Sequence, residues 1–451
     1  MGDAVLTEEL RSRVNGEVLA RGDEAYERER PAYVDAGEPA IIVRPEAPDE
    51  VGRIVRYAAK QNMPISVRCG GHGASAFANP DGLVIDLSRL TDIDVRPDGT
   101  VRIGGGATWG AVAERLGEEG LALTSGDTRS VGVGGLTLGG GIGWMVRQYG
   151  LALDSLAEAE VVLASGETVT ASESRNPDLF WAIRGGGGNF GIVTSFTFRA
   201  HPLERVVFGT LTFGLDDLPG LLRGWRDAMR VAPEELNTTV LAMPPFGEEP
   251  PGVQVLVCWS GAEEAADAAL APLLALPGLV RAEVAPTAYA DVLEEPMKPE
   301  GPITMVDYNG FAADFDDATI DALIAARAEA AMSVLMIRYL RGAFNRVPAD
   351  ATAFAHRDAE VLLILAAFLP GDVDPAEVDG LRERWSALDE RTLGMYSNFA
   401  ATSGENITGR IFPPATLERL REVKRAYDPR NLFARNHNIR PAEGAVMAMP
   451  G

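Results

Sequence analysis

Cysteine and histidine are both scarce in this chain. Of its 451 residues only two are cysteines, Cys69 and Cys258, and they form no CxxC pair. This spacing excludes a zinc ribbon and a disulfide framework. The 4 histidines show no ligand spacing with one another or with carboxylates, so we expect no metal site.

Positive charge and long apolar runs are also in short supply. The chain carries 41 Lys and Arg residues against 65 Asp and Glu residues, a formal net charge of -24. This charge repels polyphosphate, so we expect no nucleic-acid partner. No apolar run approaches the roughly 20 residues that cross a bilayer. The start, Met1-Gly2-Asp3-Ala4, lacks the basic and apolar regions of a secretion signal. We therefore expect a cytoplasmic protein without a membrane span.

Glycine, by contrast, is concentrated in two runs, at 67–73 and 131–143. Glycine reaches positive φ angles and lets a ligand approach backbone N–H groups closely. Successive N–H groups that point inward form a nest for phosphate oxygens. His72 lies within the first run. An imidazole among phosphate-binding glycines predicts a nucleotide cofactor and a bond to it; the alternative is an ordinary loop histidine.

These runs also carry a family resemblance. The pattern Arg68-x-Gly70-Gly71-His72, followed by Val131-Gly132-x-Gly134-Gly135, resembles the FAD-linked oxidases of the vanillyl-alcohol-oxidase superfamily and, within it, the berberine-bridge-enzyme-like group. In that group the histidine at this position carries the flavin covalently, through the methyl group on the benzenoid ring. The resemblance assigns that role to His72.

The resemblance also implies a set of cofactor contacts. They are Arg68, Cys69, Gly70, Gly71, His72, Gly73, Gly126, Val131, Gly132, Gly134, Gly135, Gly139, Gly140, Gly141, Gly143, Gly191, Ile192, Val193, Asn436 and Asn438. Doubly linked members have a cysteine shortly before the second run, where this chain has Thr128. A threonine hydroxyl cannot form the attacking thiolate, and Cys69 is too close to His72 to be an obvious replacement. We therefore expect FAD with a single covalent link, and cysteines that are buried small apolar residues.

The coarse pattern before residue 200 alternates strands and helices. A buried strand is predicted at 40–45, a helix capped by Asp49 and ended by Asn62, and a strand at 65–67 that leads into the first run. Residues 158–171 predict a hairpin. A helix that starts at Pro177 precedes Gly-rich residues 185–191 and a strand at 192–198. The GxGxxG spacing there lacks the strand-then-helix order of a dinucleotide fingerprint, so we favour a helix-to-strand turn near the flavin nucleotide.

After residue 200 the pattern changes. Strands are predicted at 206–213, 238–243, 253–259 and 334–340, helices at 263–276, 320–332 and 375–389, and a proline-rich linker at 244–251. A helix that begins at Pro413-Pro414 and is stopped by residues 427–433 then leads into a tail with Asn436 and Asn438, which in the family folds back on the flavin. We predict an α+β protein: a two-part FAD-binding domain of the PCMH type (1–200 and 410–451) with an inserted substrate domain (201–409) built on an antiparallel sheet covered by helices.

Oxidation of an alcohol or amine requires a base for the proton that leaves with the hydride. Tyr339 is one candidate, and on a strand it shares a face with Arg341, while Arg338 points the other way. Tyr396 is the other, because its segment resembles the family's Tyr-x-Asn-Phe strand. For each tyrosine the alternative is a core residue with a bonded hydroxyl. Many relatives carry a further tyrosine where this chain has Leu417.

The resulting functional prediction is an FAD-dependent oxidase of a small alcohol, sugar, amine or natural-product intermediate, which reduces O₂ to hydrogen peroxide. Val131 aligns with a small residue that leaves room for O₂ beside the flavin, unless it only packs the loop. A flavin dehydrogenase with another acceptor and a non-catalytic flavin-binding protein are the alternatives. The sequence leaves the oligomeric state open.

Overall fold

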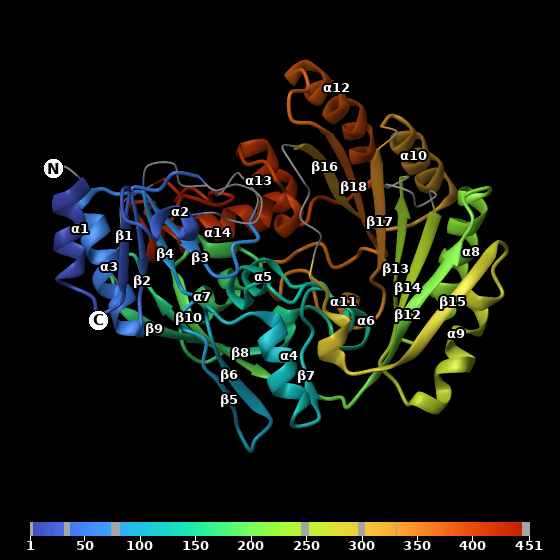
Figure 1. Ribbon diagram of the computed structural model, residues 1–451, viewed down its shortest axis with the longest axis horizontal. Coiled ribbons are helices and arrows are strands. Elements are labelled where there is room, and N and C mark those ends of the chain that lie inside the picture. The colour runs from blue at the N-terminus through green and yellow to red at the C-terminus, as the bar shows by residue number, and fades with distance from the viewer. Residues whose placement is uncertain are drawn as a thin grey trace.

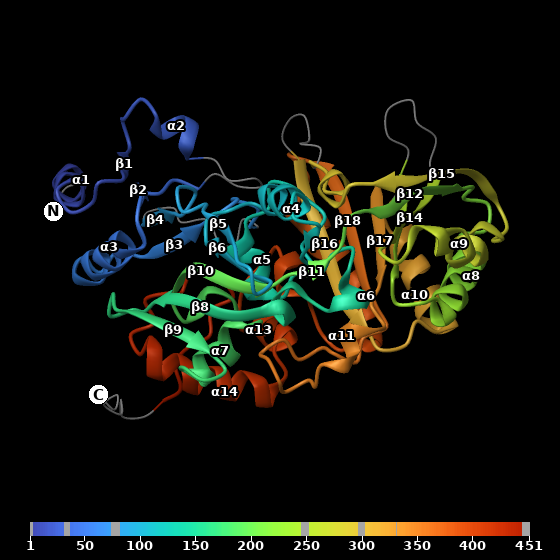
Figure 2. The same cartoon turned by 90° about the horizontal axis from the view of Figure 1, so that it is seen from below.

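The computed structural model describes residues 3–30, 37–73, 82–244, 252–295, 303–330 and 332–443. Within these ranges the strands form sheets of four, five, two and seven strands. The seven-stranded sheet lies on the right of Figure 1, and the four- and five-stranded sheets lie on the left; Figure 2 shows the same separation from below. Across the described ranges, each helix is too short or too polar to cross a membrane.

The four-stranded sheet contains the strand–helix–strand unit that delivers the first glycine run. Its order is β1-β2-β4-β3, and β2, β4 and β3 run parallel. The bounds are Glu17–Ala20 (β1), Ile41–Arg44 (β2), Ile65–Arg68 (β3), Leu83–Asp86 (β4), Asp3–Arg11 (α1), Tyr26–Glu29 (α2) and Pro48–Gln61 (α3). The predicted helix is confirmed, but its cap is Ala47 rather than Asp49, because Pro48 takes the first helical position. Asn62, with φ 55°, ends it.

The five-stranded sheet is antiparallel, with the order β5-β6-β10-β8-β9, and a two-stranded sheet pairs β7 with β11. The strands are Ile93–Val95 (β5), Thr100–Gly104 (β6), Leu121–Ala122 (β7), Leu156–Val162 (β8), Thr168–Ser172 (β9), Ile192–Arg199 (β10) and His201–Pro202 (β11). The helices are Trp109–Gly117 (α4), Val133–Gly139 (α5), Val146–Tyr149 (α6) and Pro177–Ile183 (α7). The predicted hairpin is confirmed as β8 and β9. Because α7 precedes the glycines and β10 follows them, the dinucleotide fingerprint is excluded.

The seven-stranded sheet is antiparallel, with the order β15-β12-β14-β13-β17-β18-β16. Its strands are Val206–Phe213 (β12), Leu236–Met243 (β13), Gly252–Trp259 (β14), Leu279–Thr287 (β15), Ile303–Ala312 (β16), Ser333–Tyr339 (β17) and Val361–Pro370 (β18). Helices Leu218–Val231 (α8), Ala266–Leu274 (α9), Asp317–Ala328 (α10) and Pro375–Trp385 (α12) cover its outer face in Figure 1. There, alternate residues such as Leu211, Val255 and Ile337 form a fully buried core.

This arrangement confirms the predicted α+β class with helices on one face of an antiparallel sheet. The sequence patterns missed β15, β16 and β18. Apart from Pro244, the proline-rich linker lies outside the described residues. The remaining helices are Ala343–Arg346 (α11), Glu405–Ile411 (α13) and Pro414–Tyr427 (α14). Helix α14 returns to pack on α7, where the Tyr427 hydroxyl donates to Asp178 at 2.9 Å.

Candidate functional site

The two glycine runs lie in direct contact. A Cβ on Gly70 would come closer than 3.0 Å to the oxygen of Ser130 and the nitrogen of Gly132, and a Cβ on Gly132 would come equally close to Cys69. Chain packing therefore requires glycine at these positions. The two runs, 67–73 and 131–143, are distant in sequence but form one surface, which we call the glycine surface.

Gly135, on α5 in the second run, behaves differently. The residue is exposed, and a Cβ on it would meet no atom of the described residues within 4 Å. Packing within the protein thus does not require glycine there. Bare backbone at an exposed point of a glycine surface suits the close approach of a ligand.

Other predicted cofactor residues serve internal packing. A Cβ on Gly126, Gly143 or Gly191 would lie less than 3.0 Å from neighbouring protein atoms. Ile192 and Val193 are buried at the start of β10. Packing within the protein therefore accounts for these residues.

His72 is half-buried at the end of the first run, between Gly71, whose φ is 72°, and the exposed Gly73. Its Nε2 lies 2.9 Å from Ser130 Oγ. The Ser130 hydroxyl in turn lies 2.6 Å from Oε2 of Glu295, a residue of the segment between β15 and β16. The sequence analysis predicted neither Ser130 nor Glu295 as a site residue. Ser130 adjoins the second run and could have been noticed, but only tertiary structure brings Glu295 here.

Cys258 is buried, as predicted, whereas Cys69 is only half-buried. Burial and the charge of Asp86 raise the pKa of Cys69 to about 12, although backbone amides of Gly134 and Gly135 oppose the shift. Burial also raises the pKa of Cys258 well above its usual range. Neither side chain is a thiolate near neutral pH.

Arg68 connects the first run to the neighbouring strand β4 and helix α2. Its guanidinium donates to Oδ2 of Asp86 at 2.7 Å and to the carbonyl oxygens of Glu29 at 2.8 Å and Arg30 at 3.2 Å. Burial alone would raise the pKa of Asp86, but the ion pair and hydrogen bonds with Arg68 lower it. Arg68 therefore ties β3 to β4 and to α2 and so orients the loop that carries His72.

Tyr396 lies against the far end of the second run. Its hydroxyl accepts hydrogen bonds from the amide of Gly141 and from Nδ2 of Asn398, both at 2.9 Å. Its own amide donates to Oδ1 of Asn309, on β16, at 2.7 Å. A Cβ on Gly139 would collide with Asn398, so the segment packs directly on the run. The segment is a short 3-10 turn at Ser397–Phe399 and not the strand expected from the family pattern, because it folds around Gly139.

The environment of the Tyr396 hydroxyl has two opposing effects. The side chain is 3% exposed, and burial raises its pKa. The two N–H donors on its oxygen favour the charged form and oppose that shift. The Tyr396 hydroxyl is thus hydrogen-bonded within the core, which agrees with the alternative prediction of a core residue. It also adjoins the glycine surface.

Tyr339 and Arg341 lie elsewhere. Tyr339 is fully buried under α8 against Trp225, and its hydroxyl donates to Oε1 of Glu360 at 3.2 Å. Burial and the charge of Glu360 raise the pKa of Tyr339 above its usual range. Arg341 is 3.6 Å from the same carboxylate. The structure therefore does not bring these two residues together with Tyr396.

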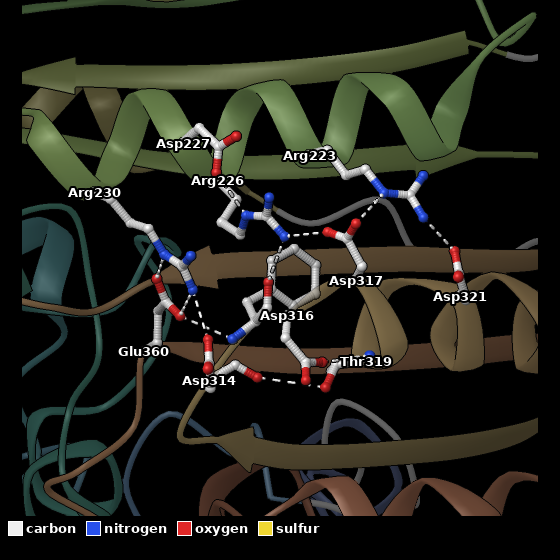
Figure 3. Close-up of polar contacts among 11 residues, drawn as sticks. Arg223, Arg226, Asp227, Arg230, Asp314, Asp316, Asp317, Thr319, Asp321 and Glu360 are labelled. Carbon is white, nitrogen blue, oxygen red and sulfur yellow. Dashed lines mark hydrogen bonds and ion pairs between the residues drawn. The ribbon is translucent and has the colours of Figure 1, made fainter.

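Glu360 belongs to an ion-pair network on the helix-covered side of the sheet, which Figure 3 shows. Arg230, on α8, donates to both its carboxylate oxygens at 2.7 and 2.8 Å and also reaches Asp314. Further along α8, Arg226 and Arg223 pair with Asp317, at the start of α10. The network joins α8 to α10, which is a structural role.

Arg338 points to the opposite face of β17, toward the glycine surface. Its guanidinium donates to both carboxylate oxygens of Asp127 at 2.9 and 2.5 Å and to Oγ1 of Thr239 at 3.0 Å. It also lies over the Trp144 ring, 4.9 Å from the centroid. This bidentate pair ties the seven-stranded sheet to the segment that enters the second run.

The tail after α14 folds onto the turn between α7 and β10. The fully buried Lys424 donates to the carbonyl oxygen of Asn189 and to Asp428, both at 2.6 Å. The side chain of Asn189 donates to the carbonyl of His437 at 3.2 Å and accepts from the amide of Ile439 at 3.0 Å. These bonds bring the C-terminal segment to the first half of the chain.

Asn436 and Asn438 lie on this tail. Their Oδ1 atoms are buried and accept no hydrogen bond from any residue that the structure describes. A buried acceptor without a donor is costly, and ligand N–H or O–H groups would satisfy it. Across the described ranges, no group of three or more His, Cys, Asp or Glu residues is placed to hold a metal ion.

Comparison with known proteins places the chain in a family. It matches the model of an FAD binding domain over residues 39–172 and the berberine and berberine-like model over residues 395–440. It is 32% identical to an uncharacterized FAD-linked oxidoreductase of Bacillus subtilis (strain 168), over 96% of this chain and 98% of that protein. It is 31% identical to (R)-6-hydroxynicotine oxidase of Paenarthrobacter nicotinovorans, over 89% and 91% of the two chains.

Solved structures agree. The crystal structure of 6-hydroxy-D-nicotine oxidase from Arthrobacter nicotinovorans superposes with a TM-score of 0.84 at 27% identity, over 95% of this chain and 98% of that one. The chain belongs to the FAD-linked oxidoreductases of the berberine-bridge-enzyme-like group. The family, the PCMH-type fold and the enzyme class predicted from the glycine runs are thereby confirmed.

The residues present fit the FAD of this family. The exposed backbone of Gly135 leaves room for close approach, and the buried oxygens of Asn436 and Asn438 require hydrogen-bond donors. His72 stands at the rim of the same surface.

Proposed function

We propose that this protein is an oxidase in which a small amine or alcohol gives a hydride to FAD held through His72, and O₂ takes the electrons as hydrogen peroxide. Bound FAD supplies the two-electron acceptor. The proposal rests above all on the half-buried His72 within a surface built by both glycine runs. Acid precipitation tests the linkage: we expect a yellow pellet from the wild type and a colourless one from His72→Ala, and a colourless wild-type pellet would refute it.

A single link follows from the same residues. The solved glucooligosaccharide oxidase of Acremonium strictum, which is 24% identical to this chain, has a 6-S-cysteinyl, 8α-N1-histidyl FAD. This chain has Thr128 in place of the cysteine, and its own Cys69 is a protonated thiol. We therefore propose attachment through His72 alone. Mass spectrometry of the flavin peptide should find one modified residue.

The predicted cofactor contacts divide into two groups in this proposal. Gly135, Asn436 and Asn438 touch FAD directly, whereas Gly132 and the other packed glycines shape the surface. Gly135→Ala should fold with a stability that is unchanged or raised by up to about 1 kcal/mol, since alanine meets no described atom there and favours the helix, but it should bind FAD more weakly. Gly132→Ala should instead lose stability by several kcal/mol, because its Cβ has no room. Equal effects of the two substitutions on both measurements would contradict this division.

Tyr396 is the proposed base, in place of Tyr339 with its neighbour Arg341. It adjoins the second run, and the Gly141 and Asn398 donors on its oxygen favour the phenolate. Val131, half-buried beside this surface, is proposed to leave room for O₂. Rapid mixing of reduced enzyme with air-saturated buffer tests the last step, and slow re-oxidation would make the protein a dehydrogenase with another acceptor.

The open face of the seven-stranded sheet favours an apolar substrate. Leu241, Met336 and Ile364 are paired across β13, β17 and β18, and all three are half-buried on the face opposite the helices. The same row ends at Asn309, which holds the Tyr396 segment. Among named relatives, (R)-6-hydroxynicotine oxidase fits this apolar row better than xylooligosaccharide oxidase. Anaerobic mixing should bleach the flavin with aryl amines or alcohols and not with oligosaccharides.

We further propose that the chain divides into FAD-binding parts at 1–200 and 410–451 and a substrate domain at 201–409. The packing of α14 on α7 and the buried Lys424 support the return of the last segment.

A further inference from the structure

A short chain of hydrogen bonds links His72 to a carboxylate from a remote part of the sequence. Nε2 of His72 lies 2.9 Å from Ser130 Oγ, and the Ser130 hydroxyl donates to Oε2 of Glu295 at 2.6 Å. A carboxylate only accepts, so the serine proton points to Glu295 and the serine oxygen accepts from Nε2–H. The chain therefore selects the tautomer of His72 that carries its proton on Nε2.

Backbone pairing holds Glu295 in this position. The amide of Glu294 donates to the carbonyl of Asp127 at 3.0 Å, and the amide of Arg129 donates to the carbonyl of Glu294 at 3.2 Å. This register places the next residue, Glu295, beside Ser130. A segment of the seven-stranded sheet's connection between β15 and β16 thus reaches across to the glycine surface.

Arg129, which precedes Ser130 in the sequence, has other partners. The guanidinium of Arg129 donates to the carbonyl of Ala290 at 2.9 Å and pairs with Glu114, on α4. Glu295 therefore presents a carboxylate oxygen to Ser130 that Arg129 does not occupy.

We propose that Glu295 acts through Ser130 to position and deprotonate His72 while the flavin becomes attached. The connection between β15 and β16, which carries Glu295, would thereby control the rate of covalent flavin attachment. This inference rests on the proposed His72 linkage. Attachment through Nε2 would displace the serine, whereas attachment through Nδ1 preserves the hydrogen-bond chain. The nucleophilic atom is therefore Nδ1, and Glu295 is a positioning residue.

The step balances with O₂ as the oxidant. A C–H bond of the flavin 8α-methyl group breaks, and a bond from Nδ1 to that carbon forms. The proton on Nε2 passes to the Ser130 oxygen as the serine proton passes to Glu295. The electron pair of the broken C–H bond would enter the flavin, and the proton of that bond would leave to solvent. O₂ would then accept the two electrons and two protons, equal in number to the one lost from the methyl group and the one passed to Glu295, to give hydrogen peroxide.

Full-length apoprotein, expressed in a riboflavin-auxotrophic host, provides the test. Each variant is incubated aerobically with FAD, and acid-stable flavin is measured against time and FAD concentration. Glu295→Gln and Ser130→Ala should each lower the saturating attachment rate about 100-fold, with unchanged half-saturating FAD. Glu295→Asp and Ser130→Thr should restore much of the rate. Glu294→Gln, a neighbouring carboxylate whose backbone makes the pairing, should load like the wild type.

The outcomes separate the two proposals. A wild-type pellet without flavin refutes the linkage itself. A yellow wild-type pellet, with Glu295→Gln loading equally fast, refutes the role of Glu295 alone. If Glu295→Gln instead raises half-saturating FAD and Glu295→Asp restores nothing, Glu295 only shapes the surface and the inference also fails.

Discussion

The two faces of the seven-stranded sheet differ in what their side chains contact. On the helix-covered face Ile337 and Tyr339 are fully buried in an apolar core. On the other face Arg338 holds the segment that enters the second glycine run, and Asn309 holds the Tyr396 segment. Met336, between these polar groups, remains half-exposed.

Neighbouring residues on β17 thus serve different ends. Alternation along a strand sends successive side chains to opposite faces, so Ile337 stabilises the fold while Met336 and Arg338 face the glycine surface. Substitutions that differ by a single position should therefore separate stability from chemistry. Matched pairs across the sheet test this division.

The largest difference should come from the two tyrosines. Tyr396→Phe should slow flavin reduction by about 10²–10⁴-fold, the contribution of a positioned base, whereas Tyr339→Phe should leave the rate within about twofold. Because burial raises the pKa of Tyr396, its phenolate is scarce at pH 7. The wild-type reduction rate should therefore rise with pH through the neutral and alkaline range. Anaerobic stopped-flow reduction at a series of pH values measures both.

Tyr339→Phe is the internal control for this pair, since it removes the same hydroxyl from the helix-covered face. It should cost about 0.5–1.5 kcal/mol of stability for the lost bond to Glu360. If both variants reduce the flavin at the wild-type rate, Tyr396 is a core residue only. A pH profile that stays sloped in Tyr396→Phe would assign the proton to another group.

The two tyrosines also show which features of the fold could be predicted from the sequence and which could not. Alternation correctly separated Arg338 from Tyr339, but it could not say which face the helices cover, because that depends on α8 and α10 packing from outside the strand. The helix at 414–427 was predictable because Pro414 starts it and its apolar spacing is regular. Strand β18 was missed because its run of apolar residues lacks alternation, being buried on both faces at its start.

A second pair lies on adjacent positions of β17. Ile337→Ala removes a fully buried side chain and should cost about 2–5 kcal/mol of unfolding free energy. Met336→Ala removes a half-exposed one and should cost less than about 1 kcal/mol, while it raises the KM of an apolar substrate. Thermal midpoints and steady-state kinetics measure the two effects. A raised KM in Ile337→Ala without one in Met336→Ala would reverse the assignment of the faces.

The site itself was only partly predictable. The glycine runs and His72 could be read from spacing, since backbone chemistry there is local. Ser130 and Glu295 could not be joined from sequence, because the pairing of Glu294 with the segment from Asp127 to Arg129 is long-range. Long-range register carries no local periodicity that a single sequence reveals.

The smallest effects should come from one carboxylate on each face. Burial alone would raise the pKa of Glu360, but hydrogen bonds from Arg230 and the Phe315 amide lower it. Burial raises the pKa of Asp307, on the open face of β16, despite a bond from the Ala401 amide. Glu360→Gln should therefore destabilise the protein at pH 7 by about 1–3 kcal/mol, whereas Asp307→Asn should stabilise it by about 1 kcal/mol.

The pH dependence of the two variants should run in opposite directions. The stabilisation from Glu360 is present above its unfolded pKa, about 4.3, and is lost as the pH falls through its lower folded value. The penalty from Asp307 is present above its raised folded pKa and disappears below its unfolded value, about 3.9. Thermal midpoints at pH 7 and pH 4 should therefore converge on the wild type from below for Glu360→Gln and from above for Asp307→Asn. Midpoint shifts of the same sign would mean that the open face is as well satisfied as the helix-covered one, and the contrast between them would not hold.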